Sequence, residues 1–283
     1  MATKKISTKP QTPSANGVKF ACYYPHFLKP QDKKEVLDYL YSLHPIWEQR
    51  YSKSNPPPAD QEQRQLLRPV YWLGNWQFAC LDYYHPPKGI FHRCVEAEPF
   101  PLCLQKIIHQ VEQMVHQIYP AKDIPKGWHM NTCLINYYGD KIENGKKIVC
   151  ARVGEHKDFE PGPVVSLSFG DRALFQFVSS TSKNAISQVV LQQWLEDNSL
   201  QIFGGDRFKK QLFHRVQRVD RKQGLEKPMI IPNFETRRLN LTFRYVPNEH
   251  IQEFKKLPTH LQEDIRPYME ELSKHSDHFA KAL

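Results

Sequence analysis

The stretch from Asn131 to residue 247 constrains the fold most, because it is a succession of short segments in which polar and apolar residues alternate. Alternation with a period of two is typical of strands that have one buried face. Six such segments are NTCLINYY, VVSLSFG, ALFQFV, SLQIFGG, LFHRVQRV and RRLNLTFRYV. Many short strands in one block, separated by turn residues, favour a barrel or a sandwich.

The sequence on either side of this block has helical periodicity instead. Apolar residues recur at helical spacing in 32–43 and again in 102–118, so we expect an amphipathic helix in each range. Between them, RPVYWLGNWQFACLDYYHPP is aromatic-rich and contains a Gly-Asn turn between two short extended pieces. The end of the chain, HLQEDIRPYMEELSKHSDHFAKAL, is expected to be helical and peripheral.

These patterns divide the chain into four parts and predict a mainly β fold with flanking helices. The parts are a disordered basic tail (1–17), an N-terminal part with helices (18–130), a β-rich core (131–247) and a C-terminal helical segment (248–283). The tail is rich in Lys, Ser, Thr and Pro, a composition that buries too little apolar surface to fold.

Charge and composition limit the setting in which the chain works. The formal net charge of +9 suits a polyanionic partner, but a basic surface can equally serve only to keep the protein soluble. No apolar run approaches membrane-spanning length, and the first residues lack the apolar core of a secretory signal. We therefore expect an intracellular protein, cytoplasmic or nuclear, that acts as a monomer.

The six cysteines support the same expectation. They are scattered and include no C-x-x-C pair, so a structural zinc site is not expected. In a reducing compartment they should be free thiols.

Strand geometry groups several polar residues, because residues two apart point to the same side of a sheet. In GEHKDFE this rule pairs His156 with Asp158, and in CLINYY it pairs Asn136 with Tyr138. The polar face of RRLNLTFR consists of Arg238, Asn240, Thr242 and Arg244. Each pattern alone also fits an ordinary half-exposed strand, so the interpretation depends on their combination and order.

Two histidines and one carboxylate on a common face are the ligand set of non-haem Fe(II) oxygenases. His156, Asp158 and His214 supply those groups. Two arginines that face into a barrel are costly unless they are paired. A small dicarboxylate could pair with both arginines, since a guanidinium group binds a carboxylate through two hydrogen bonds.

The ordered set of motifs resembles the AlkB family of Fe(II)- and 2-oxoglutarate-dependent dioxygenases. CLINYY resembles the N-x-Y strand of the family, GEHKDFE its H-x-D turn, LFHRV the strand of its second histidine, and RRLNLTFR its closing strand. VVSLSFGDRALFQF is similar to the hairpin between the two ligand strands. The resemblance covers roughly residues 20–247 and is strong after Asn131.

This resemblance implies a double-stranded β-helix, or jelly roll, and an enzyme that uses Fe(II), 2-oxoglutarate and O2. It implies that the catalytic iron is bound by His156, Asp158 and His214. The residues implied to hold 2-oxoglutarate are Asn136, Tyr138, Arg238, Asn240 and Arg244. Arg238 would pair with the carboxylate remote from the metal, and Arg244 would lie near the metal-bound end.

The implied reaction is the oxidative demethylation of alkylated bases in DNA or RNA. The damaged base must leave the duplex and stack on aromatic rings. RPVYWLGNW resembles the nucleotide-recognition lid of the family and contains Arg68, Tyr71, Trp72 and Asn75, although Trp and Tyr in such strands are often core residues. Glu160 matches the position of an acidic residue that contacts the base.

The chain departs from the family pattern in GDKIENGKKIVCARVG, an insertion between Tyr138 and His156. Its Asn-Gly pair predicts a hairpin turn. The insertion concentrates the cations Lys141, Lys146, Lys147 and Arg152. We expect this hairpin to contact a phosphate backbone, and the alternative is a hairpin that only fills a surface gap. A smaller departure is GGDRFKKQLFH before His214, which is longer than usual.

Two alternative functions stay open. The same fold could support a hydroxylase or demethylase that acts on a protein or a small molecule. The second alternative is a catalytically silent binding module, and the intact set of three metal ligands argues against it. Steep salt dependence of oligonucleotide binding would separate the nucleic-acid enzyme from the hydroxylase.

Overall fold

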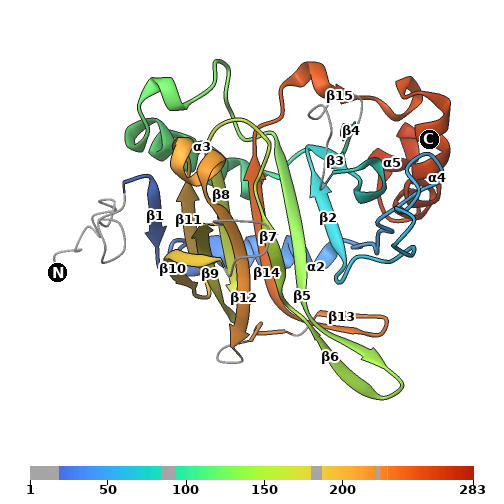
Figure 1. Cartoon of the computed structure of the whole chain (residues 1–283), viewed down its shortest axis with the longest axis horizontal. Coiled ribbons are helices and arrows are strands. Elements are labelled where there is room, and N and C mark those ends of the chain that lie inside the picture. The colour runs from blue at the N-terminus through green and yellow to red at the C-terminus, as the bar shows by residue number, and fades with distance from the viewer. Residues whose placement is uncertain (1–18, 84–93, 180–186, 221–223, 228) are drawn as a thin grey trace.

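The computed structural model describes residues 19–83, 94–179, 187–220, 224–227 and 229–283. The tail expected at 1–17 lies outside the described residues. Two antiparallel sheets face each other and form the body of the molecule (Figure 1). The expected mainly β class with flanking helices is confirmed.

The larger sheet contains strands from both the N-terminal part and the β-rich block. Its order is β1 (Ala21–Tyr24), β11 (Ser199–Phe203), β8 (Val164–Gly170), β14 (Phe234–Arg244), β5 (Thr132–Glu143) and β2 (Val70–Leu73). Two further strands join it at its lower end, β13 (Met229–Ile231) on β14 and β6 (Lys146–Cys150) on β5. The sheet therefore joins the two parts of the chain by hydrogen bonds.

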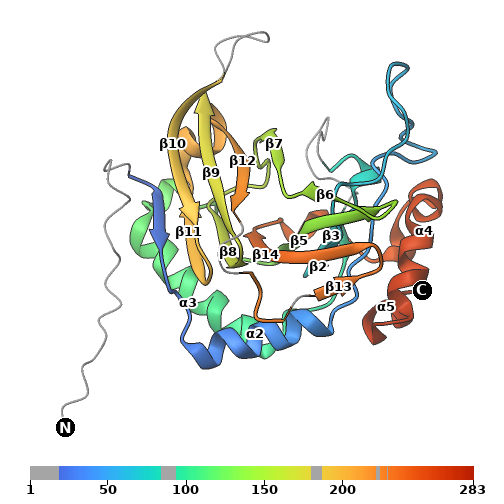
Figure 2. The same ribbon diagram turned by 90° about the horizontal axis from the view of Figure 1, so that it is seen from below.

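The smaller sheet packs over one face of the larger sheet (Figure 2). Its order is β10 (Gln188–Leu195), β9 (Arg172–Ser179), β12 (Phe213–Asp220) and β7 (Val153–His156). From β7 to β12 the chain crosses between the two sheets at every step except β9 to β10, which are neighbours in the smaller sheet. This alternation is the jelly roll that the sequence resemblance implied. A third, small sheet contains β15 (Ile251–Gln252), β4 (Cys94–Glu96) and β3 (Asn75–Gln77).

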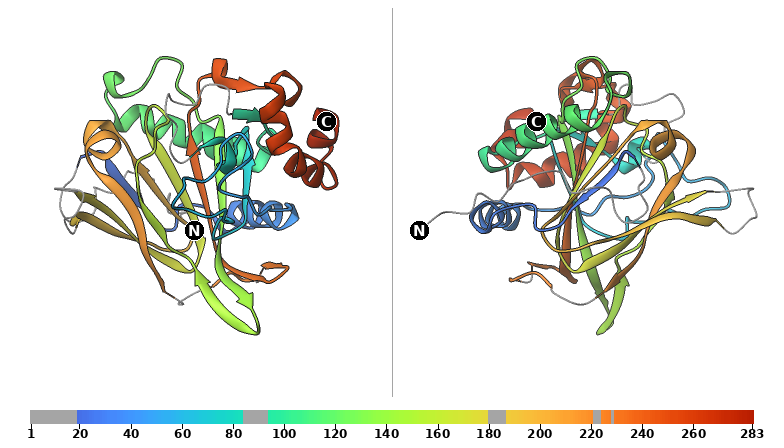
Figure 3. Two further views of the ribbon diagram at one scale, coloured as in Figure 1. Left: turned by 45° about the vertical axis from the view of Figure 1, so that its right-hand side comes forward. Right: turned by 90° about the vertical axis from the view of Figure 1, so that its left-hand side faces the viewer.

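Helices cover the outer face and one end of the larger sheet. Helix α2 (Pro30–Ser42) begins two residues before the expected range, and α3 (Leu102–Ile118) spans the expected residues. Figure 2 shows both beneath the larger sheet, on the side away from the smaller one. Helices α4 (Thr259–Ser273) and α5 (Asp277–Ala282) pack at the end where β2 lies (Figure 3).

Strand β14 shows how alternation builds this arrangement. Leu239, Leu241 and Phe243 are buried in the core that α3 shares through Leu104 and Ile107. Each buried aliphatic or aromatic side chain of this kind contributes about 1.5–3 kcal/mol. The opposite, polar face of the strand then points between the two sheets, where the functional cavity lies.

A β-bulge sets the register of that polar face. Thr236 pairs with Gly139 and Arg238 with Tyr138, so Arg237 is an extra residue on β14. The Arg237 guanidinium forms ion pairs with Asp140, at 3.2 Å, and with Asp171. These two carboxylates hold the bulge and allow Arg238 to point inward.

The expected hairpin turn in the insertion is present. Asn144 and Gly145 connect β5 to β6 with φ of 50° and 74°, the positive values that an Asn-Gly turn accepts. The hairpin extends beyond the rest of the larger sheet (Figure 1). At the second expected turn, Gly74 has φ of 81°, and a Cβ there would lie 1.9 Å from the Asn131 carbonyl oxygen.

Two further expectations can be compared with the structure. All six cysteines belong to the described residues, and none of the six forms a disulfide bond. Within the described ranges, no helix is long and apolar enough to span a membrane.

A buried carboxylate, Glu48, ties the chain after α2 to the core. Its two oxygens accept hydrogen bonds from Trp76 Nε1, at 2.7 Å, and from the Ala79 backbone N–H, at 2.6 Å. Burial raises the pKa of Glu48 to about 7, although both hydrogen bonds act in the opposite direction.

This raised pKa predicts that the protein loses stability as the pH rises. The folded state holds the Glu48 proton more tightly than the unfolded state, so the stabilisation is complete below the unfolded pKa and disappears as the pH rises through about 7. Between about pH 5.5 and about pH 8, this group should lower the free energy of unfolding by about 2 kcal/mol. Urea unfolding of the parent and of Glu48→Gln measures the difference. Identical pH dependence in the two proteins would contradict the prediction.

Candidate active site

The three residues expected to bind iron meet in a cavity of about 500 Å³ between the two sheets. His156 ends β7, Asp158 follows it by two residues, and His214 lies on β12. The pairing of β7 with β12 places His214 directly opposite His156. One ligand atom from each of the three residues lies within 4.8 Å of the other two.

The segment before His214 accommodates its extra length in a five-residue π-helical turn, Arg207–Gln211. Phe208 of this turn packs on Phe177 of β9, with ring centroids 4.6 Å apart. His214 itself stacks on Phe175, at 5.5 Å. The aromatic packing holds the imidazole in position although the preceding segment is longer than expected.

Both imidazoles are suited to bind a metal because they are neutral at neutral pH. Burial lowers the pKa of His156. Burial lowers the pKa of His214 much further, and the neighbouring His156 lowers it as well. The Gly154 carbonyl oxygen lies 2.8 Å from His156 Nδ1, which leaves Nε2 free to face the cavity. A hydrogen bond of this kind fixes the tautomer of a metal-binding histidine.

Asp158 supplies the negative charge. Burial would raise the pKa of its carboxyl group, but the Arg244 guanidinium and His214 outweigh that effect and lower it. Arg244 donates to Oδ1, with Nε at 2.9 Å and Nη2 at 2.7 Å. Among the described residues, Oδ2 of Asp158 and Nδ1 of His214 have no hydrogen-bond partner although both atoms are buried.

These observations fit a divalent iron ion. Two neutral imidazoles and one ionised carboxylate form the donor set that such an ion prefers. Asp158 Oδ2, which accepts no hydrogen bond from the described residues, lies 3.4 Å from His214 Nε2 and belongs to the same group of ligand atoms. His156, Asp158 and His214 would hold the metal.

Arg238 dominates the other end of the cavity and fits the remote carboxylate of 2-oxoglutarate. Its side chain is 1 % exposed, and its Nη2 donates to Ser168 Oγ at 2.9 Å. Its Nε and Nη1 have no hydrogen-bond partner in the described part of the chain. Burial lowers the pKa of Arg238 to about 10, so the group is still a cation at neutral pH. A buried cation with two unused donors calls for an anion with two acceptors.

Tyr138 and Arg68 complete this end of the cavity. The Tyr138 ring lies 5.0 Å from the Arg238 guanidinium and 4.7 Å from that of Arg68. The Arg68 Nε also donates to Asn136 Oδ1 at 2.8 Å. Arg68, Asn136, Tyr138 and Arg238 all line the cavity. The guanidinium groups of Arg68 and Arg238 therefore lie at the end of the cavity where the sequence predicted only Arg238.

The remaining predicted cosubstrate residues have partners of their own. Asn240 Nδ2 donates to Ser166 Oγ at 2.8 Å, which ties β14 to β8 while the side chain still lines the cavity. Arg244 lies beside the metal ligand Asp158, at the end of the cavity where the sequence resemblance placed it. Its Nη1 has no hydrogen-bond partner among the residues that the structure describes.

Three of the four predicted substrate residues do not line the cavity. Tyr71 and Trp72 are core residues, 2 % and 1 % exposed, and the Tyr71 hydroxyl donates to Glu98 at 2.9 Å. Glu160 is buried behind Arg244, 3.6 Å from its Nε, and accepts from Gln77 at 3.2 Å. The prediction that Tyr71, Trp72 and Glu160 contact the substrate is therefore wrong. For Tyr71 and Trp72 the reason is that all four residues of β2 are buried, so neither face of that strand is open. Arg68 alone lines the cavity.

Other residues occupy the places that the sequence resemblance assigned to Tyr71 and Trp72. Tyr83 and Phe159 line the cavity, and their rings meet edge to face with centroids 5.5 Å apart. Trp72 lies behind Tyr83, at 5.2 Å. Arg64 and Arg152 line the cavity and are exposed. Two of these residues had a sequence signal, Arg152 as a cation of the insertion and Phe159 by its position beside Asp158. Tyr83 and Arg64 come from segments without strand periodicity.

A jelly roll with this donor set between its sheets defines an iron-dependent oxygenase. The model of the 2OG-Fe(II) oxygenase superfamily matches residues 20–244. The chain therefore belongs to this superfamily and is a dioxygenase that uses Fe(II), 2-oxoglutarate and O2. A search of curated proteins found no match. Among solved structures, "The structure of OsALKBH1" aligns with a TM-score of 0.46 and 21% identity, over 81% of this chain and 99% of that one.

Proposed function

We propose that this protein is an AlkB-type dioxygenase that oxidatively demethylates an alkylated base in DNA or RNA. The observation that carries the proposal is the cavity itself, which is lined by His156, Asp158 and His214, by the buried guanidinium groups of Arg68 and Arg238, and by the rings of Tyr83 and Phe159. With iron, 2-oxoglutarate and O2 bound, the site would supply hydroxylation of a methyl C–H bond: one oxygen atom of O2 enters the methyl group and the other enters succinate as 2-oxoglutarate loses CO2. The hydroxymethyl group then leaves the base as formaldehyde, which completes the demethylation.

The side chains of the cavity have separate tasks in this proposal. Arg238, with Tyr138 beside it, binds the remote carboxylate and so orients 2-oxoglutarate along the cavity. Tyr83 and Phe159 offer ring faces to a flipped base. Arg64 and Arg152, which line the cavity and are exposed, would contact phosphates near that base.

The hairpin of β5 and β6 carries less free charge than its sequence suggests. Lys147 Nζ lies 2.5 Å from Glu235 Oε2, and Lys141 Nζ lies 2.5 Å from Glu143 Oε1. Each lysine would have to leave its carboxylate before it could bind a phosphate. We therefore restrict the proposed phosphate contacts of the insertion to Lys146, which is exposed, and Arg152.

The proposal is tested by measuring succinate release on a panel of methylated oligonucleotides, single- and double-stranded, with unmodified strands as controls. We expect release above the unmodified control on at least one methylated base. Equal release on all strands, together with turnover on a peptide or a small molecule, would favour the alternative hydroxylase.

Removing the two exposed arginines of the cavity should weaken nucleic-acid binding in a salt-dependent manner. In Arg64→Gln/Arg152→Gln, two lost phosphate contacts should reduce the slope of log K against log salt by roughly 1.5–2. Binding is measured by fluorescence anisotropy over a salt series. Lys106→Gln is the matched control, because Lys106 is exposed on α3, on the outer face of the larger sheet. An unchanged slope in the double variant would exclude this phosphate surface.

A further inference from the structure

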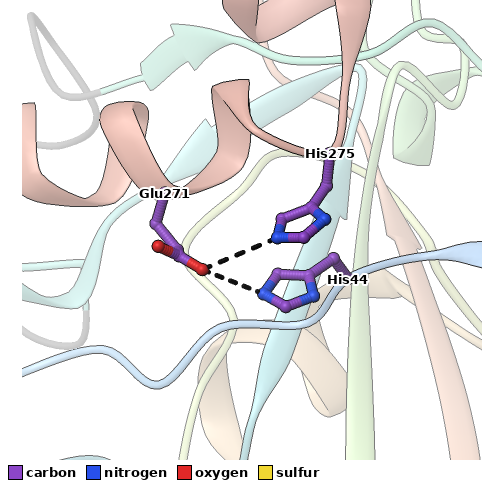
Figure 4. A group of neighbouring side chains, drawn as sticks. All are labelled: His44, Glu271 and His275. Carbon is purple, nitrogen blue, oxygen red and sulfur yellow. Dashed lines mark hydrogen bonds and ion pairs between the residues drawn. The ribbon is translucent and has the colours of Figure 1, made fainter.

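A second group of metal-binding side chains lies outside the active-site cavity. His44 follows the end of α2, Glu271 lies in the last turn of α4, and His275 follows that helix (Figure 4). One ligand atom from each residue lies within 4.8 Å of the other two. His44 and Glu271 are 227 residues apart in the sequence, so only the fold brings them together.

The two imidazoles of this group point at the same carboxylate oxygen. His44 Nε2 lies 3.2 Å and His275 Nε2 lies 3.7 Å from Glu271 Oε1. The rings stack face to face, with centroids 3.6 Å apart and planes 17° apart. Figure 4 shows both Nε2 atoms turned toward Glu271. Two imidazole nitrogens and one carboxylate oxygen therefore converge on one point.

We propose that His44, Glu271 and His275 form a second metal site, which binds a divalent transition-metal ion of the Zn²⁺ type. Imidazole nitrogens and a carboxylate oxygen are the donors that such ions take, and an open position would be filled by water. The side chains are about two-fifths exposed, with values of 41%, 41% and 42%, so an ion can reach them from solvent.

The neighbouring Lys274 competes with a metal ion for Glu271, so replacing this lysine provides an internal control. Lys274 Nζ lies 2.7 Å from the other Glu271 oxygen, Oε2, and this hydrogen bond lowers the pKa of Glu271. The carboxylate is therefore ionised at neutral pH, but part of its charge is already compensated. Replacing Lys274 by Gln should leave Glu271 free for the metal ion and tighten binding.

The metal site would fasten helix α4 to the segment that forms one wall of the catalytic cavity. The segment after His44 already touches α4, through the Gln49 backbone N–H on the Tyr268 hydroxyl at 2.8 Å and Ser52 on Asp264 at 2.8 Å. The same segment carries Arg50, which lines the active-site cavity and donates to the Ala79 carbonyl at 3.1 Å. A bound ion would add a stronger connection between these elements.

Equilibrium dialysis of the full chain against Zn²⁺, with bound zinc measured by atomic absorption, tests the site. We expect two ions per chain in the parent, because the catalytic donors also accept Zn²⁺. One ion should remain in His44→Ala/His275→Ala, and one should remain in His156→Ala. His109→Ala, an exposed histidine on α3, should still bind two.

A second measurement separates a real site from a folding defect. In the His156→Ala background, Zn²⁺ at about 100 times its Kd should raise Tm by roughly 5 °C, and Lys274→Gln should shift the rise to lower zinc concentration. His44→Ala in that background should abolish the rise. One zinc ion in the parent that disappears in His156→Ala, with no change on removing His44, would overturn the proposal.

Discussion

In the His156→Ala variant, we expect the bound Fe(II) to be lost and the conversion of 2-oxoglutarate to fall to the level seen without iron. The fold should be nearly unaffected, with a change in the free energy of unfolding of about 1 kcal/mol or less. His156 is partly exposed, and its ring hydrogen-bonds locally, to Gly154, among the residues that the structure describes. Iron stoichiometry, succinate release and urea unfolding measure the three quantities.

Asp158→Ala should give the same loss of iron but a different effect on stability. Asp158 is the main partner of the buried Arg244, whose next acidic neighbour is Glu160 at 3.6 Å. Breaking a buried ion pair from one side typically costs about 3–5 kcal/mol. His109→Ala serves as the control. Full turnover in either variant, or equal stability of the two, would contradict this assignment of roles.

In the Arg238→Lys variant, we expect the Michaelis constant for 2-oxoglutarate to rise roughly 10- to 100-fold, with a smaller effect on the maximal rate. A planar guanidinium makes two parallel hydrogen bonds to a carboxylate, whereas an ammonium makes only point contacts, and the difference is on the order of 1.5–3 kcal/mol. Succinate release at varied 2-oxoglutarate concentration measures both constants.

The adjacent arginine provides the matched control. Arg237 is held by Asp140 and Asp171 and does not line the cavity, so Arg237→Lys should leave the Michaelis constant unchanged. A Michaelis constant that changes equally in both variants would show that disturbance of β14, rather than a contact with the cosubstrate, is responsible. Without cosubstrate, Arg238→Met should unfold at a higher temperature than the parent, since it removes an unpaired buried charge.

The local periodicity of the sequence is sufficient to predict which residues of β14 share a face and to predict the helix at Leu102–Ile118. Alternation with a period of two determines which side of a strand a residue faces, so the amino-acid order alone groups Arg238, Asn240 and Arg244 on one face. The Asn-Gly turn at Asn144 is predictable for the same local reason, because few other residue pairs accept its backbone angles.

Contacts between distant segments cannot be predicted in this way. Strand β2 shows no alternation because both of its faces are buried, so nothing local distinguishes a core Tyr71 or Trp72 from a ring that faces the substrate. Glu235, the partner of Lys147, lies 88 residues away along the chain. The positive charges of the hairpin can therefore be counted from the sequence, but the carboxylates that pair with them cannot be identified from it.

The strand-rich core, the inward polar faces and the three residues able to bind iron all follow from the order of the amino acids. Three other features depend on tertiary packing: Tyr83 and Phe159 line the cavity, Glu160 lies behind Arg244, and His44 meets His275. The physical reason is that periodicity records which side of an element is buried, whereas the identity of the neighbour on that side depends on how the sheets and helices pack.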